Sequence, residues 1–392
     1  MKMLSIYQPL ILFFFALVSC KQAANVDQPT ITVAAKVYYT PDKFVMGSDL
    51  SYANQVEDYG GVFKDSGKVK DVFKLFKDRG NNLVRVRLWH TPTWTANLNN
   101  GKQYSDLQDV VKTIRRAKAE GMYVNLDLHY SDTWADPSKQ DMPKAWQGLA
   151  FNVLKDSVYN YTLNTLKYLQ NLNLTPEMIQ IGNENNNGML WSLGKIDNNN
   201  FQNFCDLAKS GIKAVRDFSQ SSSIKPQIVL HCAQLQNADW WADGVINKGG
   251  VTDFDILGLS HYYKWSTVNS MADISKTISG LKTKYNKKIM LVETAFSWTT
   301  ADADTYANIM TTNSAVEGYA ISKDGQLQYM KDLTQTVITA GGSGIQYWEP
   351  EWISSSMHDL WGSGSSWDNN TLFDFTGNAL PAFDFMTSNY QF

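Results

Sequence analysis

The chain has 392 residues, with 35 Lys or Arg against 38 Asp or Glu, and its formal net charge is −3. This length exceeds that of one small domain and suits a single large α/β barrel with insertions. The scattered positive charges form no basic stripe, so we expect no nucleic-acid partner. Three cysteines exclude a dense disulfide framework, although one bridge between Cys205 and Cys232 stays open. The 13 tryptophans suit sugar rings as well as an ordinary core.

The N-terminal segment predicts export. Lys2 precedes an apolar run over residues 10–18, which is too short to span a bilayer as a helix and ends on "LVSC". This pattern resembles a bacterial lipobox, in which Cys20 becomes the lipidated first residue, and a plain secretory signal is the alternative. We predict a signal peptide over 1–20, a flexible tether over 21–40 and a folded domain over 41–392. The protein is then expected to be an exported lipoprotein of the cell envelope that meets the membrane only through its anchor. A monomer is expected, although nothing in the sequence decides the oligomeric state.

From residue 44 onward, short apolar runs alternate with longer amphipathic stretches, which is typical of βα units around a parallel sheet. A helix is predicted over 106–121, with Asp106 as its N-cap and Gly121 at its end. The predicted strands are 44–50, 83–89, 123–130, 178–184, 227–232, 254–262, 288–294 and 344–350. Eight such strands predict a single (β/α)8 TIM barrel. Their spacing averages about 43 residues, against about 31 in a minimal barrel, so long loops are expected at the C-terminal face, notably after the third, fourth and seventh strands.

Two of these strands end on glutamate. Glu184 follows "IQIGN" on the fourth strand, and Glu293 follows "IMLV" on the seventh. These strands approach the mouth of a closed barrel from opposite sides, so the two carboxyl groups are expected to face each other. A glycosidase needs one protonated carboxyl that donates to the leaving oxygen and one carboxylate that attacks the anomeric carbon. Each glutamate alone has a structural alternative, as the partner of a backbone N–H or of Arg87.

Other polar residues lie at the same ends of the strands. Asn183 can donate a hydrogen bond to a sugar hydroxyl beside the reacting carbon, or it can cap a turn. Asp127 and His129 share one face of the third strand, because side chains alternate with a period of two, and they are expected to point toward the mouth. Their structural alternative is a buried ion pair or a hydrogen bond in the core.

Several longer passages resemble glycoside hydrolase family 53, the endo-β-1,4-galactanases, over nearly all of residues 44–386. The passages include "GSDLSYANQVEDYGG", "VRVRLWHTP", "DLHYSDTWADPSKQ", "IQIGNENNNGMLW", "IMLVETAFSW" and "QYWEPEW". The resemblance implies an endo-acting hydrolase that cuts β-1,4-galactosidic linkages in the (arabino)galactan side chains of pectin with retention of configuration. It implies Glu184 as the acid/base, Glu293 as the nucleophile that forms a covalent glycosyl-enzyme intermediate, and no cofactor for catalysis.

The resemblance also implies supporting residues. Arg87 is expected to hold Glu293 ionised, since an adjacent cation lowers the pKa of a carboxyl, and Tyr262 is expected to orient it. Trp348 is expected beneath the reacting sugar. The residues expected to contact substrate are Asp49, Arg87, Asp127, His129, Trp134, Asn183, His261, Tyr262, Trp298 and Trp348, and further candidate platforms are Trp94, Trp265 and Trp352.

Two passages depart from the family pattern. After the sixth strand, "SHYYKW" has Tyr263 where the family has proline, which leaves the conformation of that loop open. After the seventh strand, bacterial relatives carry an Asp-x-Asp-x-His-x-Asn loop that binds calcium. The passage "DADTYAN" supplies Asp302, Asp304 and Asn308 as oxygen ligands for a structural Ca²⁺, with Tyr306 in place of the histidine. A solvated acidic helix start is the alternative.

Two rival functions share some of these features. A cellulase or mannanase with the same barrel would share the Asn-Glu pair and the second glutamate, but not the long "HYSDTWADPSKQ" passage. A surface lipoprotein that binds glycans without cleaving them needs neither carboxyl, and both are present. The sequence therefore favours the galactanase, with β-1,4-galactan as its partner.

Overall fold

The computed structural model describes residues 35–311 and 316–392. All of the elements that follow lie in one compact unit, Lys36–Phe392. The predicted signal peptide, Cys20 and most of the predicted tether lie outside the described residues. Among those that are described, no helix combines the length and the hydrophobicity needed to cross a membrane.

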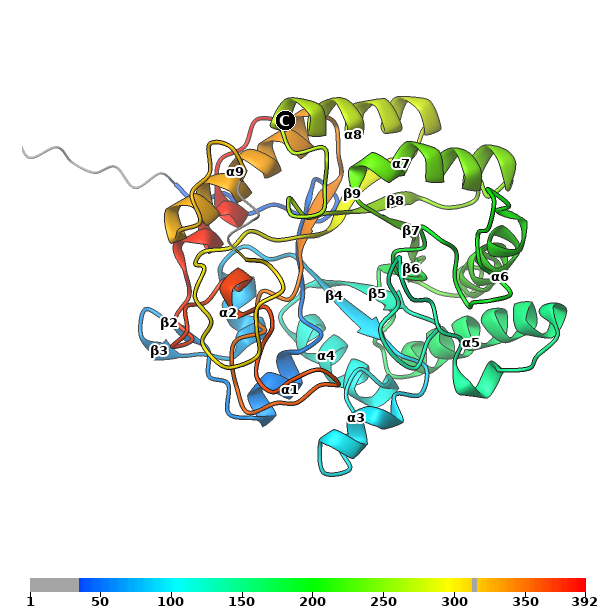
Figure 1. Cartoon of the computed structure of the whole chain (residues 1–392), viewed down its shortest axis with the longest axis horizontal. Helices are drawn as coiled ribbons and strands as arrows, with labels where there is room; N and C mark the ends of the chain where they lie inside the picture. The colour runs from blue at the N-terminus through cyan, green and yellow to red at the C-terminus, as the bar shows by residue number, and fades with distance from the viewer. Residues whose placement is uncertain (1–34, 312–315) are drawn as a thin grey trace, which may run out of the picture. The chain divides into compact units, whose positions relative to one another are not determined.

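Eight parallel strands close into a barrel in the order β1-β10-β9-β8-β7-β6-β5-β4 (Figure 1). They are β1 (Val45–Asp49), β4 (Leu83–Leu88), β5 (Tyr123–Leu128), β6 (Met178–Ile181), β7 (Gln227–Ala233), β8 (Ile256–His261), β9 (Lys288–Thr294) and β10 (Gly344–Tyr347). Each overlaps a strand predicted from the sequence, and the predicted (β/α)8 fold is confirmed. A short hairpin, β2 (Lys64–Asp65) and β3 (Lys68–Val69), stands apart from the barrel.

Helices surround the barrel (Figure 1). They are α1 (Ala53–Asp58), α2 (Val72–Asp78), α3 (Thr93–Leu98), α4 (Leu107–Ala119), α5 (Phe151–Asn171), α6 (Gln202–Ser219), α7 (Leu235–Ala242), α8 (Met271–Tyr285) and α9 (Lys323–Thr339). Asp106 caps α4 as predicted, since its carboxylate accepts a hydrogen bond from the backbone N–H of Asp109 at 2.9 Å. Gly121 follows this helix with a φ of 67°, a conformation that glycine adopts without strain.

The period of two along each strand separates the barrel interior from the helix layer. On β4, Val84, Val86 and Leu88 belong to the large cluster between strands and helices, whereas Arg85 and Arg87 alternate with them and face inward. The floor of the interior is an apolar layer formed by Val45, Leu83, Met178, Val229, Ile256, Met290 and Val292. Polar side chains fill the interior above this layer, toward the carboxyl ends of the strands.

Strand β9 departs from strict alternation at Glu293. Met290 and Val292 both face the interior, so a regular strand would turn Glu293 outward. The pairing with β8 is irregular instead, because Leu259 pairs with Leu291 while the next residue, Ser260, pairs with Glu293. The extra residue in β9 is a β-bulge, which re-aims the side chains that follow it. This bulge turns Glu293 into the barrel.

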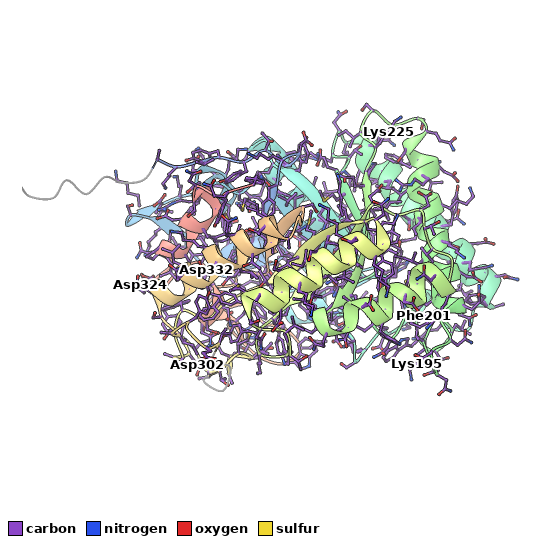
Figure 2. The ribbon with its side chains drawn as sticks, turned by 90° about the horizontal axis from the view of Figure 1, so that it is seen from above. Lys195, Phe201, Lys225, Asp302, Asp324 and Asp332 are labelled. Atoms are coloured by element: carbon purple, nitrogen blue, oxygen red, sulfur yellow. The ribbon has the colours of Figure 1, made fainter. Side chains whose placement is uncertain are left out.

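Long segments follow β5, β6 and β9, since the next major helices begin only at Phe151, Gln202 and Lys323. In Figure 2, Lys195 and Asp302, which follow β6 and β9, lie along one edge of the molecule, and Lys225, which precedes β7, lies at the opposite edge. The long loops predicted after the third, fourth and seventh strands are therefore present, and they gather at the carboxyl end of the barrel.

Candidate active site

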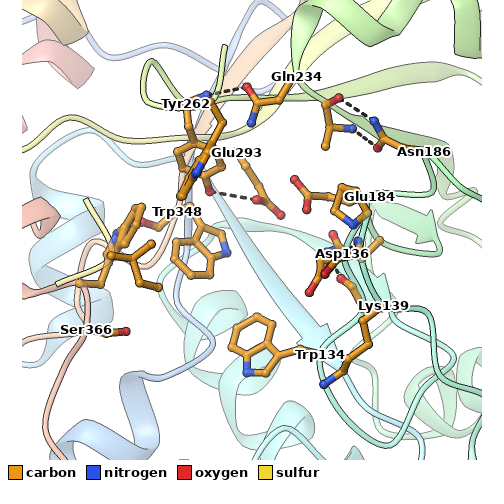
Figure 3. Close-up of a pocket in the computed structure, with 18 of the residues that line it drawn as sticks. Trp134, Asp136, Lys139, Glu184, Asn186, Gln234, Tyr262, Glu293, Trp348 and Ser366 are labelled. Atoms are coloured by element: carbon orange, nitrogen blue, oxygen red, sulfur yellow. Dashed lines mark hydrogen bonds between the residues drawn. The ribbon is translucent and has the colours of Figure 1, made fainter. Parts of the chain in front are cut away.

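A cavity of about 890 Å³ opens at the carboxyl end of the barrel. Its walls come from the loops after β5, β6, β7, β8, β9 and β10, and both predicted catalytic glutamates line it. Figure 3 shows the side chains of Glu184 and Glu293 facing each other, with Trp348 and Trp134 beside them. The two carboxyl groups that the sequence places 109 positions apart therefore meet in one pocket.

A single hydroxyl bridges the two glutamates. Ser260 Oγ lies 2.5 Å from Glu184 Oε1 and 3.5 Å from Glu293 Oε2, so these two carboxyl oxygens are no more than about 6 Å apart. Retaining glycosidases hold their carboxyl groups about 5–5.5 Å apart, whereas inverting enzymes separate them by roughly 6.5–9.5 Å to admit a water. The bound lies below the range of inverting enzymes, and the spacing fits a nucleophile and an acid/base.

The direction of the Glu184 side chain depends on an interruption of the regular strand conformation at the end of β6. Gly182 adopts a φ of 80° and Glu184 a φ of 44°, which ends the alternation of the strand. A Cβ atom at position 182 would lie 2.4 Å from Asn185 Oδ1, so the turn requires glycine. As a result, Asn183 and Glu184 both line the cavity although they are adjacent in sequence.

Arg85, and not Arg87 as expected, is the cation at Glu293. Arg85 Nη1 lies 2.9 Å from Glu293 Oε1, and the same guanidinium contacts Asp49 at 2.7 Å and Asp127 at 2.8 Å. Arg87 is one inward position closer to the mouth, and it pairs with Glu349 instead. Its guanidinium lies 4.1 Å from the ring centre of Tyr52 and 4.3 Å from that of Trp134. The expectation for Arg87 as the partner of Glu293 is therefore corrected.

The environments of the two glutamates differ in a way that suits two roles. Burial and the neighbouring charge of Glu293 raise the pKa of Glu184 well above its ordinary value. Burial also raises the pKa of Glu293 to about 7, while the Arg85 guanidinium and a hydrogen bond from Tyr262 oppose that rise. Tyr262 Oη donates to Glu293 Oε2 at 2.9 Å. Glu184 is the carboxyl that keeps a proton, and Glu293 is the one that ionises.

The polar residues expected from the third and fourth strands form the floor of the site. His129 Nε2 lies 3.0 Å from Asp127 Oδ2, and Asn183 Oδ1 accepts from Arg85 Nη2 at 2.8 Å. Asn183 Nδ2 donates one hydrogen to the carbonyl of Ala135 at 2.8 Å, which leaves its second N–H for a ligand. Asn183 lines the cavity, whereas Asp127, His129, Asp49 and Arg87 are buried beneath it.

Tryptophans form much of the wall. Trp134, Trp265, Trp348, Trp352, Trp361 and Trp367 line the cavity. Trp348 packs edge-on against Trp367, with ring centres 4.8 Å apart. Trp361 and Trp367 were not singled out from the sequence. No periodic pattern marks them, because they follow β10 in an irregular loop.

Two residues expected to contact substrate point elsewhere. Trp298 packs against Phe375 with ring centres 4.7 Å apart and donates to the carbonyl of Asp368. His261 alternates with inward-facing Ser260 and Tyr262, so it faces the helix layer, where Nε2 contacts Tyr329 Oη of α9 at 3.1 Å. Both expectations are corrected. Trp94 likewise donates to a backbone carbonyl, that of Asp132, and lies outside the lining of the cavity.

Several residues of the site have a signal that sequence reasoning passed over. Gln180, His231 and Ser260 all occupy inward positions of β6, β7 and β8, which the period of two identifies. Their side chains connect Arg85, Asn183 and Glu184. Glu349 and Glu351 are also fully buried. Their strand-end position resembles that of Glu184, but they lie beside β1 and not in the cavity.

Hydrogen bonds from other protein groups to its carboxylates hold the loop after β9. Asp304 accepts from the Tyr306 backbone at 2.7 Å, from Ser354 Oγ and from the Ser365 backbone. Asn308 Nδ2 lies 2.7 Å from both Asp302 and Asp368. Within residues 35–311 and 316–392, no three His, Cys, Asp or Glu side chains are grouped closely enough to hold a metal ion. The predicted ligands are near one another, but calcium binding stays a prediction.

The departure at Tyr263 has a local structural role. Tyr263 is buried against Phe296, with ring centres 4.9 Å apart, and its hydroxyl lies 2.9 Å from Ser297 Oγ. The loop that follows β8 is thereby attached to the start of the loop after β9. The two other thiols of the sequence, Cys205 and Cys232, are both buried and free.

Comparison with known proteins places this geometry in a family. The model of glycosyl hydrolase family 53 matches residues 45–386. The chain is 44% identical to the arabinogalactan endo-β-1,4-galactanase of Cellvibrio japonicus, with 89% of this chain and 92% of the relative covered. It is 31% identical to the endo-β-1,4-galactanase of Bacillus subtilis, with 86% and 84% covered. The solved catalytic domain from Ignisphaera aggregans superimposes with a TM-score of 0.82 at 36% identity, covering 91% of this chain and 99% of that domain. The chain belongs to glycosyl hydrolase family 53.

Proposed function

We propose that this protein is an endo-β-1,4-galactanase that hydrolyses β-1,4-galactosidic linkages in galactan and arabinogalactan with retention of configuration. The observation that carries the proposal is the pair of carboxyl groups, Glu184 and Glu293, bridged by Ser260 at a spacing of about 6 Å or less. The names of the relatives from C. japonicus and B. subtilis supply the substrate class. Enzymes of this family need no cofactor for catalysis.

The reaction proceeds in two steps. In the first, Glu293 attacks the anomeric carbon while Glu184 donates its proton to the leaving glycosidic oxygen. Arg85 and Tyr262 hold Glu293 by its two oxygens, one each, so the nucleophile is both charged and oriented. In the second step, Glu184 removes a proton from water, which attacks the anomeric carbon and releases Glu293 as a carboxylate. The second N–H of Asn183 is free for the sugar hydroxyl beside the reacting carbon.

An endo-acting enzyme needs a binding surface that extends beyond the cleaved bond. Trp265, after β8, and Trp361, after β10, line the same cavity from different loops, and their exposed fractions are 44% and 57%. Exposed indole faces stack well on sugar rings. Aromatic surfaces on separate loops thus support binding of a polymer whose chain continues past the carboxyl pair.

Digestion of defined polymers tests the substrate. Linear β-1,4-galactan should be shortened rapidly in its interior, so that oligosaccharides of several lengths appear before the smallest product dominates. Carboxymethylcellulose and β-mannan are the matched controls for the rival barrel enzymes. An inactive protein, or faster cutting of cellulose or mannan, would remove the galactanase assignment. Proton NMR of the first product should show the β-anomer, and an initial α-anomer would rule out retention.

We further propose that the protein is an exported lipoprotein anchored to the cell envelope through Cys20. The sequence "LVSC" after a short apolar run supports this. Expression with a labelled fatty acid should label the wild-type chain and leave Cys20→Ser unlabelled. Labelling of both chains, or of neither, would contradict the anchor.

A structural Ca²⁺ in the loop after β9 is a further proposal. Its support is the proximity of Asp302, Asp304 and Asn308, together with Asn308 Oδ1, a buried oxygen without a partner among the described residues. Burial raises the pKa of Asp368 to about 6, and Asp304 and Asp302 add to that rise. A cation here would offset this repulsion. EDTA should lower the melting temperature reversibly in the wild type and leave Asp302→Asn unchanged, whereas equal melting of the wild type with and without EDTA would exclude the site.

A further inference from the structure

Ser260 lies at the centre of the carboxyl pair, and its hydroxyl contacts both glutamates and a histidine. Ser260 Oγ is 2.5 Å from Glu184 Oε1, 2.8 Å from His231 Nε2 and 3.5 Å from Glu293 Oε2. The residue faces the interior because it shares the inward face of β8 with Gly258 and Tyr262, two positions away on either side, and it is fully buried. The roles assigned to the two glutamates leave this hydroxyl without a function.

His231 fixes one side of the hydroxyl. The backbone N–H of Glu184 can only donate, and it points at His231 Nδ1 at 3.3 Å. Gln180 Nε2 and Asn183 Oδ1 also lie near this nitrogen, at 3.1 Å and 3.0 Å. Asn183 Oδ1 already accepts from the guanidinium of Arg85 at 2.8 Å, so the two donors decide the assignment. Nδ1 is therefore the acceptor nitrogen of the ring, and the ring proton lies on Nε2. Burial, together with the positive charge of Arg85 and the nearby His129, lowers the pKa of His231 well below its usual value. A neutral imidazole thus donates from Nε2 to Ser260 Oγ.

The remaining hydrogen-bonding capacity of Ser260 is one hydrogen and one lone pair, because a hydroxyl has one donor and two acceptor sites. Two carboxyl groups lie within reach of it. A protonated carboxyl can use the lone pair, and an ionised one can use the hydrogen. The hydroxyl therefore satisfies both glutamates at once only when one of them is protonated and the other is charged.

We propose that Ser260 is a positioning residue whose single hydrogen turns from Glu293 to Glu184 during each catalytic cycle. The inference rests on the proposed glycosidase function. In the free enzyme, protonated Glu184 donates to Ser260, and Ser260 donates to the Glu293 carboxylate. When Glu293 forms its ester bond to the anomeric carbon, the bond to the leaving oxygen breaks and the proton of Glu184 moves to that oxygen. Glu184 is then the charged partner, and the hydroxyl turns toward it.

In the second step the hydrogen of Ser260 turns back. Water gives one proton to Glu184 and adds its oxygen to the anomeric carbon, while the ester bond to Glu293 breaks and its electron pair returns to the carboxylate. The hydrogen of Ser260 then turns back to Glu293. The hydroxyl stabilises whichever carboxyl carries the negative charge, and the His231 N–H keeps its oxygen in place throughout.

Charged and titratable groups surround this hydroxyl on all sides, and they set the pH range in which the pair holds one proton. They come from seven of the eight barrel strands or their ends, and from one loop: Asp49 of β1, Arg85 of β4, Asp127 and His129 at the end of β5, Glu184 after β6, His231 and Cys232 of β7, Tyr262 after β8, Glu293 of β9, and Asp136 in the loop after β5. None of these groups is altered in the test that follows.

The test is the pH dependence of kcat/KM on linear β-1,4-galactan for Ser260→Ala. The acid limb, the part of the profile where kcat/KM rises with pH, reports ionisation of Glu293. In the variant the charged form of Glu293 loses a hydrogen-bond donor, so this limb should move to higher pH by about one unit. The basic limb reports Glu184 and should move less, because the hydroxyl serves this carboxyl in both of its protonation states. At pH values below the wild-type acid limb, kcat/KM should fall about tenfold.

Matched variants separate this role from a structural one. Ser48→Ala removes the same hydroxyl from β1, where Oγ has no partner among the described residues, and should leave both limbs in place. Ser260→Cys fills the site with a weaker donor and should move the acid limb in the same direction by a smaller amount, which keeps the test available if Ser260→Ala does not fold. A uniform loss of kcat/KM without a shift of the acid limb, or a shift of the basic limb alone, would overturn the inference. Failure of the wild type to cut galactan would instead overturn the proposed function.

Discussion

Replacing Arg85 tests the central electrostatic argument. Arg85 is almost fully buried and contacts three carboxylates, those of Asp49, Asp127 and Glu293, at 2.7–2.9 Å. Burial alone raises the pKa of Glu293, and Arg85 is the first group that opposes the rise. An opposite charge at this distance lowers the pKa of a carboxyl by roughly one to three. Arg85→Met should therefore move the acid limb of kcat/KM upward by roughly one to three pH units.

The loss of activity follows from that shift. Below the limb, each pH unit lowers the ionised fraction of Glu293 about tenfold, so activity at a fixed acidic pH should fall roughly 10- to 1,000-fold. The assay is release of reducing ends from linear galactan across the pH range. Removing one partner of a buried ion pair also costs roughly 3–5 kcal/mol of folding free energy, so the melting temperature must be measured in parallel.

Arg87→Met is the matched control, because Arg87 is the next inward residue of the same strand and is equally buried. The partner of Arg87 is Glu349, so Arg87→Met should destabilise the protein, while the acid limb should move less than in Arg85→Met. The reasoning would be refuted if Arg87→Met moved the acid limb and Arg85→Met did not. That result would return the role to the residue first expected from the sequence.

Glu184→Gln should lower kcat on galactan by roughly 10²–10⁴-fold, since general acid catalysis contributes about that much. A substrate whose leaving group needs no protonation should regain the rate of the first step in this variant. Equal loss of rate on both substrates would contradict the acid role. Glu293→Ala should abolish turnover and prevent trapping of a covalent intermediate, which intact-mass measurement detects, and wild-type turnover in this variant would reassign the nucleophile. Trp348→Ala should raise KM or lower kcat on galactan by up to about tenfold. Trp298→Ala should change neither, because Trp298 lies outside the cavity. Equal effects of the two tryptophan variants on kcat/KM would contradict the placement of the binding surface.

The barrel could be predicted because its signals are local. Apolar runs of strand length, each followed by an amphipathic stretch, are set by short-range alternation, and the eight predicted strands match the observed ones. The two glutamates were also predicted, since each ends such a run. Their meeting in one cavity follows from closure of the barrel, which is a consequence of the strand count.

The choice between Arg85 and Arg87 could not be made in this way. Both alternate onto the inner face of β4, and only the depth of each in the barrel decides which carboxylate its long side chain reaches. His261 is a different case, because the period of two that places Tyr262 inward places its neighbour outward. The error with Trp298 has another cause, since an indole in a long loop gives no periodic signal for the direction of its ring.

The bulge of β9 has a consequence for engineering. The direction of Glu293 is set by the number of residues in the strand and not by the identity of any one of them, because one additional residue separates the partner of Leu259 from that of Ser260. Grafting the glutamate, arginine, serine and tyrosine of this site onto a barrel with eight regular strands would deliver the nucleophile to the helix layer. A designer who copies the side chains must therefore also copy an insertion that no side-chain list records.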